Sequence, residues 1–189
     1  TPGRMLGCLL LERHWPRVRP YTEIAYRELI ESLDYVILPD GGYVEGPTYF
    51  CCVGHHGGLP LYLYARARGL PFEEVIPAAM RRCGNFGAVF RSSDPAQDQI
   101  PMCDAGPKHP LDSMAFMASA LPQSEWVSLF RKAYDGQRPT ADPAYSDGAQ
   151  PMADLMMAWV LESKIPPAGP NPAPFVFLPT MGVMASTRP

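Results

Sequence analysis

Long apolar runs are missing from this 189-residue sequence. No window approaches the roughly eighteen consecutive apolar residues that a membrane-spanning helix needs, so we expect neither a transmembrane helix nor a membrane partner. The apolar stretch 5–11 is short, and Glu12, Arg13 and His14 follow it without a small-residue cleavage site. It is therefore typical of the end of a core helix rather than of a signal peptide.

Positive charge is also scarce. The formal net charge is −3, and the sequence has no stripe of Lys and Arg that could neutralise the phosphates of a nucleic acid. We therefore expect no nucleic-acid partner.

Paired cysteine motifs are absent as well. The five cysteines are odd in number and include no Cys-x-x-Cys pair, which argues against a disulfide framework. Cys51 and Cys52 lie near His55 and His56, but adjacent cysteines rarely converge on one tetrahedral zinc ion. We expect no metal site in this chain and interpret the cysteines as small buried side chains.

What the sequence does contain is enough apolar material for a folded core. Hydrophobic residues make up 47% of the chain and aromatic residues 11%, and 189 residues suffice for one domain. The apolar spacing is mainly helical, as in segment 21–33, where Ala25, Leu29 and Leu33 recur every four residues. Further helices are expected at 59–68, 77–90, 111–121, 124–134 and 151–163, with a strand-like stretch at 35–38, an extended one at 100–104 and a loop at 135–148.

Two features mark the ends of helical segments. Gly69 is a natural C-cap for segment 59–68, whose last turn carries Arg66 and Arg68. Both arginines suit the helix dipole there, and contact with a substrate is the alternative. Segment 165–174 holds five prolines in ten residues, a composition that favours extended polyproline II and marks a domain boundary.

The most informative stretch is the Gly/Pro bend at 39–49. Its glycines permit positive φ or close approach of a ligand, and its prolines fix φ. Four chemically useful side chains remain to be displayed: Asp40, Tyr43, Glu45 and Tyr49. An ordinary surface loop with inward-packed tyrosines is the alternative interpretation.

The run Pro39-Asp-Gly-Gly-Tyr-Val-Glu-Gly-Pro-Thr-Tyr49 resembles the Asp-Gly…Glu-Gly-x-x-Tyr signature of heparinase II/III-like polysaccharide lyases. The order of helical segments, Pro-rich segment and final stretch 175–188 is similar to that family over nearly the whole chain. The resemblance implies a mainly α fold: a partial α/α toroid of helical hairpins, with the first strands of a C-terminal β-sandwich. It divides the chain into toroid at 1–164, linker at 165–174 and truncated sandwich at 175–189, so we expect an internal fragment.

The family cleaves acidic, uronate-containing polysaccharides or oligosaccharides by β-elimination, which removes the proton on C5 and expels the oxygen on C4. The resemblance assigns proton transfer to Tyr49. A free tyrosine titrates near pH 10, so acting as a base near neutrality would require about 3 pKa units, or roughly 4 kcal/mol, of phenolate stabilisation. Tyr43, Glu45, His55, His56 and Asp40 are the expected substrate-binding residues around it.

Other parts of the family's machinery have no counterpart in this sequence. The Asn or His that neutralises the substrate carboxylate lies upstream in the family, and a further His and the metal ligands of some members lie downstream in the sandwich. We therefore expect no cofactor in this chain and no lyase activity from the isolated chain. The resemblance favours a periplasmic or secreted location and leaves a cytoplasmic one open, together with the oligomeric state.

Two alternative functions remain. Asp40 and Glu45 form a carboxylate pair, which would suit a hydrolase of uronate-containing sugars on the same kind of helical fold. A non-catalytic toroid that holds sugar chains on aromatic faces is the second alternative.

Overall fold

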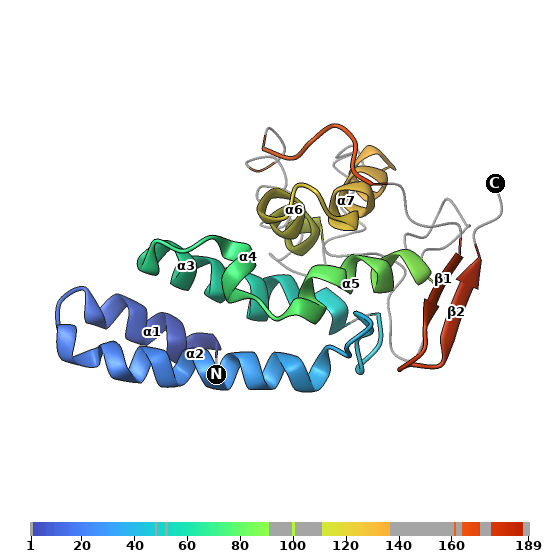
Figure 1. Cartoon of the computed structure of the whole chain (residues 1–189). Coiled ribbons are helices and arrows are strands. Elements are labelled where there is room, and N and C mark those ends of the chain that lie inside the picture. Colours follow the sequence, from blue (N-terminus) through green and yellow to red (C-terminus); the bar gives the residue numbers. More distant parts are fainter. Residues whose placement is uncertain are drawn as a thin grey trace, which may run out of the picture.

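The computed structural model describes residues 2–47, 49–51, 53–90, 100, 111–136, 161, 164–170 and 175–186. The protein is mainly helical, with a small two-stranded antiparallel sheet near its C-terminal end (Figure 1). The helices are α1 (Pro2–Glu12), α2 (Arg19–Val36), α3 (Leu59–Arg68), α4 (Phe72–Val75), α5 (Ala78–Val89), α6 (Leu111–Ala120) and α7 (Glu125–Gly136). Short 3₁₀ turns span Pro16–Val18 (η1) and Tyr49–Cys51 (η2), and a π-helical segment spans Val53–Gly58 (η3).

The described helices are arranged in layers (Figure 1). The hairpin of α1 and α2 forms one layer, α3 and α5 lie in the middle, and the pair α6 and α7 covers the other side. The sequence predicted paired helices, and the pairs α1–α2 and α6–α7 confirm this prediction. In the described parts of the chain, no helix combines the length and apolar character that a membrane span requires.

Helix α2 is longer than its sequence predicted. The prediction of a strand-like stretch at 35–38 is wrong, because Tyr35 and Val36 belong to α2. The apolar side chains at every fourth position, Leu29, Leu33 and Ile37, remain buried along one face, and the Ile37 N–H still donates to the Leu33 carbonyl. This helical periodicity outweighs the β-propensity of the Tyr-Val-Ile sequence.

Helices α3 and α5 agree closely with their predicted bounds. Gly69 caps α3 in the left-handed conformation, with φ of 67°. Helix α5 buries Met80, Cys83 and Phe86 in the core. The predicted helix at 151–163, the extended segment at 100–104 and the loop at 135–148 lie almost wholly outside the described residues.

Strands β1 (Phe175–Leu178) and β2 (Val183–Ser186) form a two-stranded hairpin where strands were expected to begin, at Phe175. They pair in antiparallel register, with Val176 opposite Ala185 and Leu178 opposite Val183. These four residues face the helical core, and the hairpin lies beside α5 (Figure 1).

The described part of the Pro-rich segment, residues 164–170, packs against α7. Ile165 is buried, and Arg131 donates from Nε to the Pro166 carbonyl at 2.9 Å and from Nη2 to the Ile165 carbonyl at 2.6 Å. These contacts hold the chain against the α6–α7 layer before it reaches β1.

Candidate functional site

The bend that follows α2 is a tight turn closed by backbone hydrogen bonds. Leu38 and Gly42 are joined by an N–H to carbonyl bond of 2.8 Å, and Ile37 forms a single antiparallel bridge with Tyr43. Gly41 has a φ of 90°, and a Cβ atom there would lie 2.5 Å from the backbone oxygen of Arg82. Glycine is therefore required at 41 both for the turn and for the close approach to α5.

Asp40 fixes this bend to the sheet. Its Oδ1 accepts the Gly42 N–H at 3.0 Å, and its Oδ2 accepts the Thr180 N–H at 2.7 Å. Partial burial alone would raise the pKa of the Asp40 carboxyl, but the hydrogen bonds from Gly42 and Thr180 outweigh it and lower that pKa. Both carboxylate oxygens are thus engaged with the backbone of the protein.

Tyr43 and Glu45 are the predicted site residues that the structure brings into contact. The Tyr43 ring is buried and packs edge-on against Phe50 and Phe86. Its hydroxyl donates to Glu45 Oε2 at 3.0 Å, while the rest of Glu45 reaches the surface. Tyr43 therefore anchors the bend in the core and orients the Glu45 carboxylate.

Tyr49 lies at the surface where the bend ends. Its side chain is 44% exposed, whereas that of Phe50, next in sequence, is only 3% exposed. Phe50 stacks on Trp126 with ring centroids 4.9 Å apart and an interplanar angle of 7°. The buried Phe50 ring fixes the η2 turn and so sets the position from which Tyr49 is displayed.

His55 and His56 follow in the π-helical segment η3. His55 is half-buried and His56 is exposed, and the glycines around them are buried. A Cβ atom at Gly54 would lie 1.9 Å from Ser113 Oγ on α6, so small residues allow η3 to press against that helix. A π-helical turn is rare and is frequent at functional sites.

No metal site is evident in the part of the chain that the structure describes. Within those residues, no three His, Cys, Asp or Glu side chains converge closely enough to hold a metal ion. Cys52, one member of the Cys-His cluster seen in the sequence, lies outside them.

A second cluster of functional groups was not foreseen from the sequence as a unit. It consists of Glu12, Glu23, Tyr64 and Arg68, and we call it the Arg68 cluster. Arg68 donates from Nη1 and Nη2 to the two oxygens of Glu12, at 2.5 and 3.0 Å, and from Nε to Glu23 Oε1 at 2.9 Å. The Tyr64 hydroxyl donates to the other Glu23 oxygen at 2.5 Å.

Aromatic rings support the Arg68 cluster from one side. The Arg68 guanidinium carbon lies 4.9 Å from the centroid of the Tyr64 ring, which in turn stacks on Tyr26 at 4.3 Å. Burial and the neighbouring Glu23 carboxylate raise the pKa of Tyr64 to about 12, and the hydrogen bond from Arg68 lowers the pKa of Glu12. Glu12 and Arg68 therefore remain charged near neutral pH.

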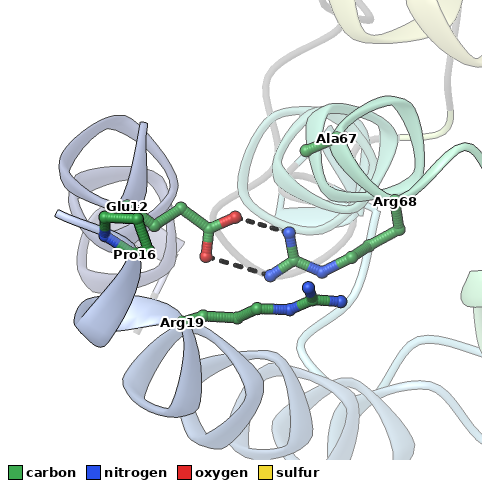
Figure 2. A pocket seen from close by; sticks show the side chains of 5 residues that line it. All are labelled: Glu12, Pro16, Arg19, Ala67 and Arg68. Carbon is green, nitrogen blue, oxygen red and sulfur yellow. Dashed lines mark hydrogen bonds and ion pairs between the residues drawn. The ribbon is translucent and has the colours of Figure 1, made fainter. Parts of the chain in front are cut away.

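A cavity of about 300 Å³ opens beside this cluster (Figure 2). It is lined by Glu12, Pro16, Arg19, Ala67 and Arg68, which come from α1, η1, the start of α2 and the end of α3. Figure 2 shows Glu12 paired with Arg68 and the guanidinium of Arg19 turned toward the same cavity.

Comparisons with protein-family models, with curated proteins and with solved structures gave no match for this chain.

Proposed function

We propose that this chain is part of a polysaccharide lyase that cleaves uronate-containing saccharides by β-elimination, with Tyr49 as the residue that transfers the proton. The observation that carries the proposal is the display of Tyr49. Its ring is 44% exposed at the end of a bend whose neighbouring residues Tyr43 and Phe50 are locked in the core. A phenol held in this way is available to a long polymer, which a buried tyrosine is not.

The residues close to Tyr49 in the sequence carry groups that can hydrogen-bond a sugar. Glu45 is oriented by Tyr43 and can accept hydrogen bonds from sugar hydroxyls. His56 is exposed a short distance further along the chain, and its ring can donate a hydrogen bond to a carboxylate. In this proposal, Tyr49 removes the C5 proton or protonates the departing C4 oxygen, and the toroid is the proposed arrangement of the helical hairpins.

The engagement of Asp40 disfavours the hydrolase alternative. A glycosidase needs two carboxylates that face the scissile bond. Both oxygens of Asp40 accept backbone N–H groups, from Gly42 and Thr180, so this carboxylate serves to brace the bend. Glu45 alone does not make an acid and nucleophile pair.

The decisive experiment compares Tyr49→Phe with Tyr35→Phe in the longest natural polypeptide that contains these residues. Tyr35 is a matched control because it is an exposed tyrosine in the last turn of α2 and is not one of the predicted site residues. Alginate and heparan sulfate are the substrates, and the unsaturated uronate product is followed by its near-ultraviolet absorbance. We expect Tyr49→Phe to lower this rate at least about 100-fold while oligosaccharide binding persists, because only the proton-transferring hydroxyl is lost.

Three results would contradict the proposal. Wild-type rates in Tyr49→Phe would remove Tyr49 from the chemistry. Cleavage without an unsaturated product would indicate a hydrolase. Binding of the saccharide without any cleavage by the unmodified polypeptide would indicate a carbohydrate-binding module.

A further inference from the structure

We propose that the cavity beside the Arg68 cluster binds an oxyanion, namely the carboxylate or phosphate group of a small molecule. The cavity lies at the start of α2, whereas the Tyr49 bend follows the end of that helix. Eighteen residues of α-helix span about 27 Å, so the two sites are separate. The inference does not depend on lyase activity.

The carboxylates at this cavity already have partners. Glu12 Oε1 accepts from Arg68, and Glu12 Oε2 accepts from both Arg68 and Thr22, at 3.0 and 2.7 Å. Behind them, the two oxygens of Glu23 accept from Arg68 and Tyr64. All four carboxylate oxygens therefore have hydrogen-bond donors, and the two negative charges of Glu12 and Glu23 are balanced by the positive charges of Arg68 and Arg19.

Hydrogen-bond donors, in contrast, are left over. Within the described residues, Arg19 donates no hydrogen bond and acts on the nearby Glu12 only through its charge, so its N–H groups remain available on the wall of the cavity. Arg68 uses one of the two N–H groups on Nη1 for Glu12, which leaves the other. A cavity with satisfied acceptors and spare guanidinium donors is complementary to an oxyanion.

The Arg68 cluster also makes the cavity rigid. The side chain of Arg68 is only 10% exposed and is fixed by two carboxylates and the Tyr64 ring. A guanidinium held in this way loses little conformational entropy when a ligand binds. The volume of about 300 Å³ is at the lower end of small-molecule sites, which suits a single phosphate or a monosaccharide acid.

The test titrates the 189-residue chain at low ionic strength with inorganic phosphate, with glucuronate and with neutral glucose. Binding is followed through the NMR signals of the arginine Nε–H groups. We expect saturable shifts of Arg19 and Arg68 with phosphate or with glucuronate and none with glucose, and the tighter of the two anions identifies the source of the oxyanion.

Three variants separate a built site from general surface charge. Arg19→Gln should weaken binding about tenfold or more, because it removes the charged donor. Ala67→Leu keeps every charge but fills the cavity, and should also weaken binding about tenfold. Arg17→Gln removes a neighbouring exposed arginine that does not line the cavity, so it should change affinity by less than about twofold.

The proposal is overturned if neither anion binds, or if Arg17→Gln weakens binding as much as Arg19→Gln does. It is also overturned if Ala67→Leu binds as tightly as the unmodified chain. Arg19, Ala67 and Arg17 are all exposed, so these substitutions should leave the fold intact, and the far-ultraviolet circular dichroism spectrum of each variant checks this.

Discussion

Asp40 is a half-buried residue that joins two parts of the chain 140 positions apart. The sequence pattern Pro-Asp-Gly-Gly predicts a turn and suggests that Asp40 points toward a ligand. The structure gives the carboxylate two backbone partners instead, one within the turn and one at Thr180. The partner at Thr180 could not be foreseen, because no local pattern indicates which distant backbone N–H a carboxylate will accept.

The lowered pKa of Asp40 makes its contribution to stability dependent on pH. A carboxyl whose pKa is lower in the folded chain than in the unfolded chain stabilises the fold above its ordinary pKa of 3.8. This contribution is lost as the pH falls through the folded value. Asn at this position can accept one of the two N–H groups but carries no charge.

We therefore predict that Asp40→Asn lowers the free energy of unfolding at pH 7 by about 1 kcal/mol, allowing for partial solvent exposure. The difference from the unmodified protein should shrink as the pH is lowered from 7 to below 3.8 and the Asp40 carboxyl becomes protonated, so unfolding is compared at pH 7 and at the lower pH. Urea unfolding at both pH values measures it. Asp34→Asn, an exposed change on α2, is the control, and an equal effect of both substitutions would argue against the bracing role.

At the scale of elements, the repeating apolar positions predicted the described helices well. Segments 59–68, 77–90, 111–121 and 124–134 correspond to α3, α5, α6 and α7 within a few residues. The strand-like stretch at 35–38 was wrong because burial at every fourth residue continues to Ile37. Burial of the apolar face along the whole of α2 contributes more free energy than the β-propensity of three residues at its end.

The Arg68 cluster could not be predicted from the sequence, because the partners of Arg68 are far from it in the chain. The position of Arg68 in the last turn of α3 was read correctly from the sequence, and its interaction with the helix dipole was the expected role. Its partners Glu12 and Glu23 are 56 and 45 residues away. The cluster depends on how α1, α2 and α3 pack together, which composition and spacing do not specify.

Comparison of two arginines in the same helix turn measures what this cluster contributes. Arg68→Met leaves two carboxylates without their charge partner, and we predict that it lowers the free energy of unfolding by about 3 kcal/mol. Arg66→Met removes the same charge from the same helix end, but Arg66 is exposed, so the loss should stay near 0.5 kcal/mol.

Urea denaturation followed by circular dichroism gives both values. Because the two variants share the loss of the dipole interaction, their difference isolates the contacts with Glu12 and Glu23. Similar losses in the two variants would mean that the cluster adds nothing beyond a surface charge.

At the scale of the whole molecule, the C-terminal hairpin is packed onto the helices. Leu178 is 1% exposed and belongs to the core, and Val176, Val183 and Ala185 pack against it. The bend contributes as well, because Thr180 in the hairpin turn donates to Asp40. The onset of strand structure at Phe175 was predicted from the sequence, whereas the face that packs on α5 required the strand register.

This packing implies that the hairpin and the helices unfold together. We predict that Leu178→Ala lowers the free energy of unfolding by about 2–3 kcal/mol, because it removes buried apolar contacts and leaves a cavity between the hairpin and the core. Phe177→Ala is the matched control, since Phe177 is adjacent in β1, is 53% exposed and points to the opposite face. Its cost should be below about 1 kcal/mol.

The readout is the urea midpoint of the helical signal at about 222 nm, which reports on α1 to α7 and not on the strands. If Leu178→Ala left this midpoint where Phe177→Ala does, the hairpin would be an independent appendage. A clear shift of the helical midpoint by Leu178→Ala alone would place the hairpin, the bend and the helical core in one cooperative unit.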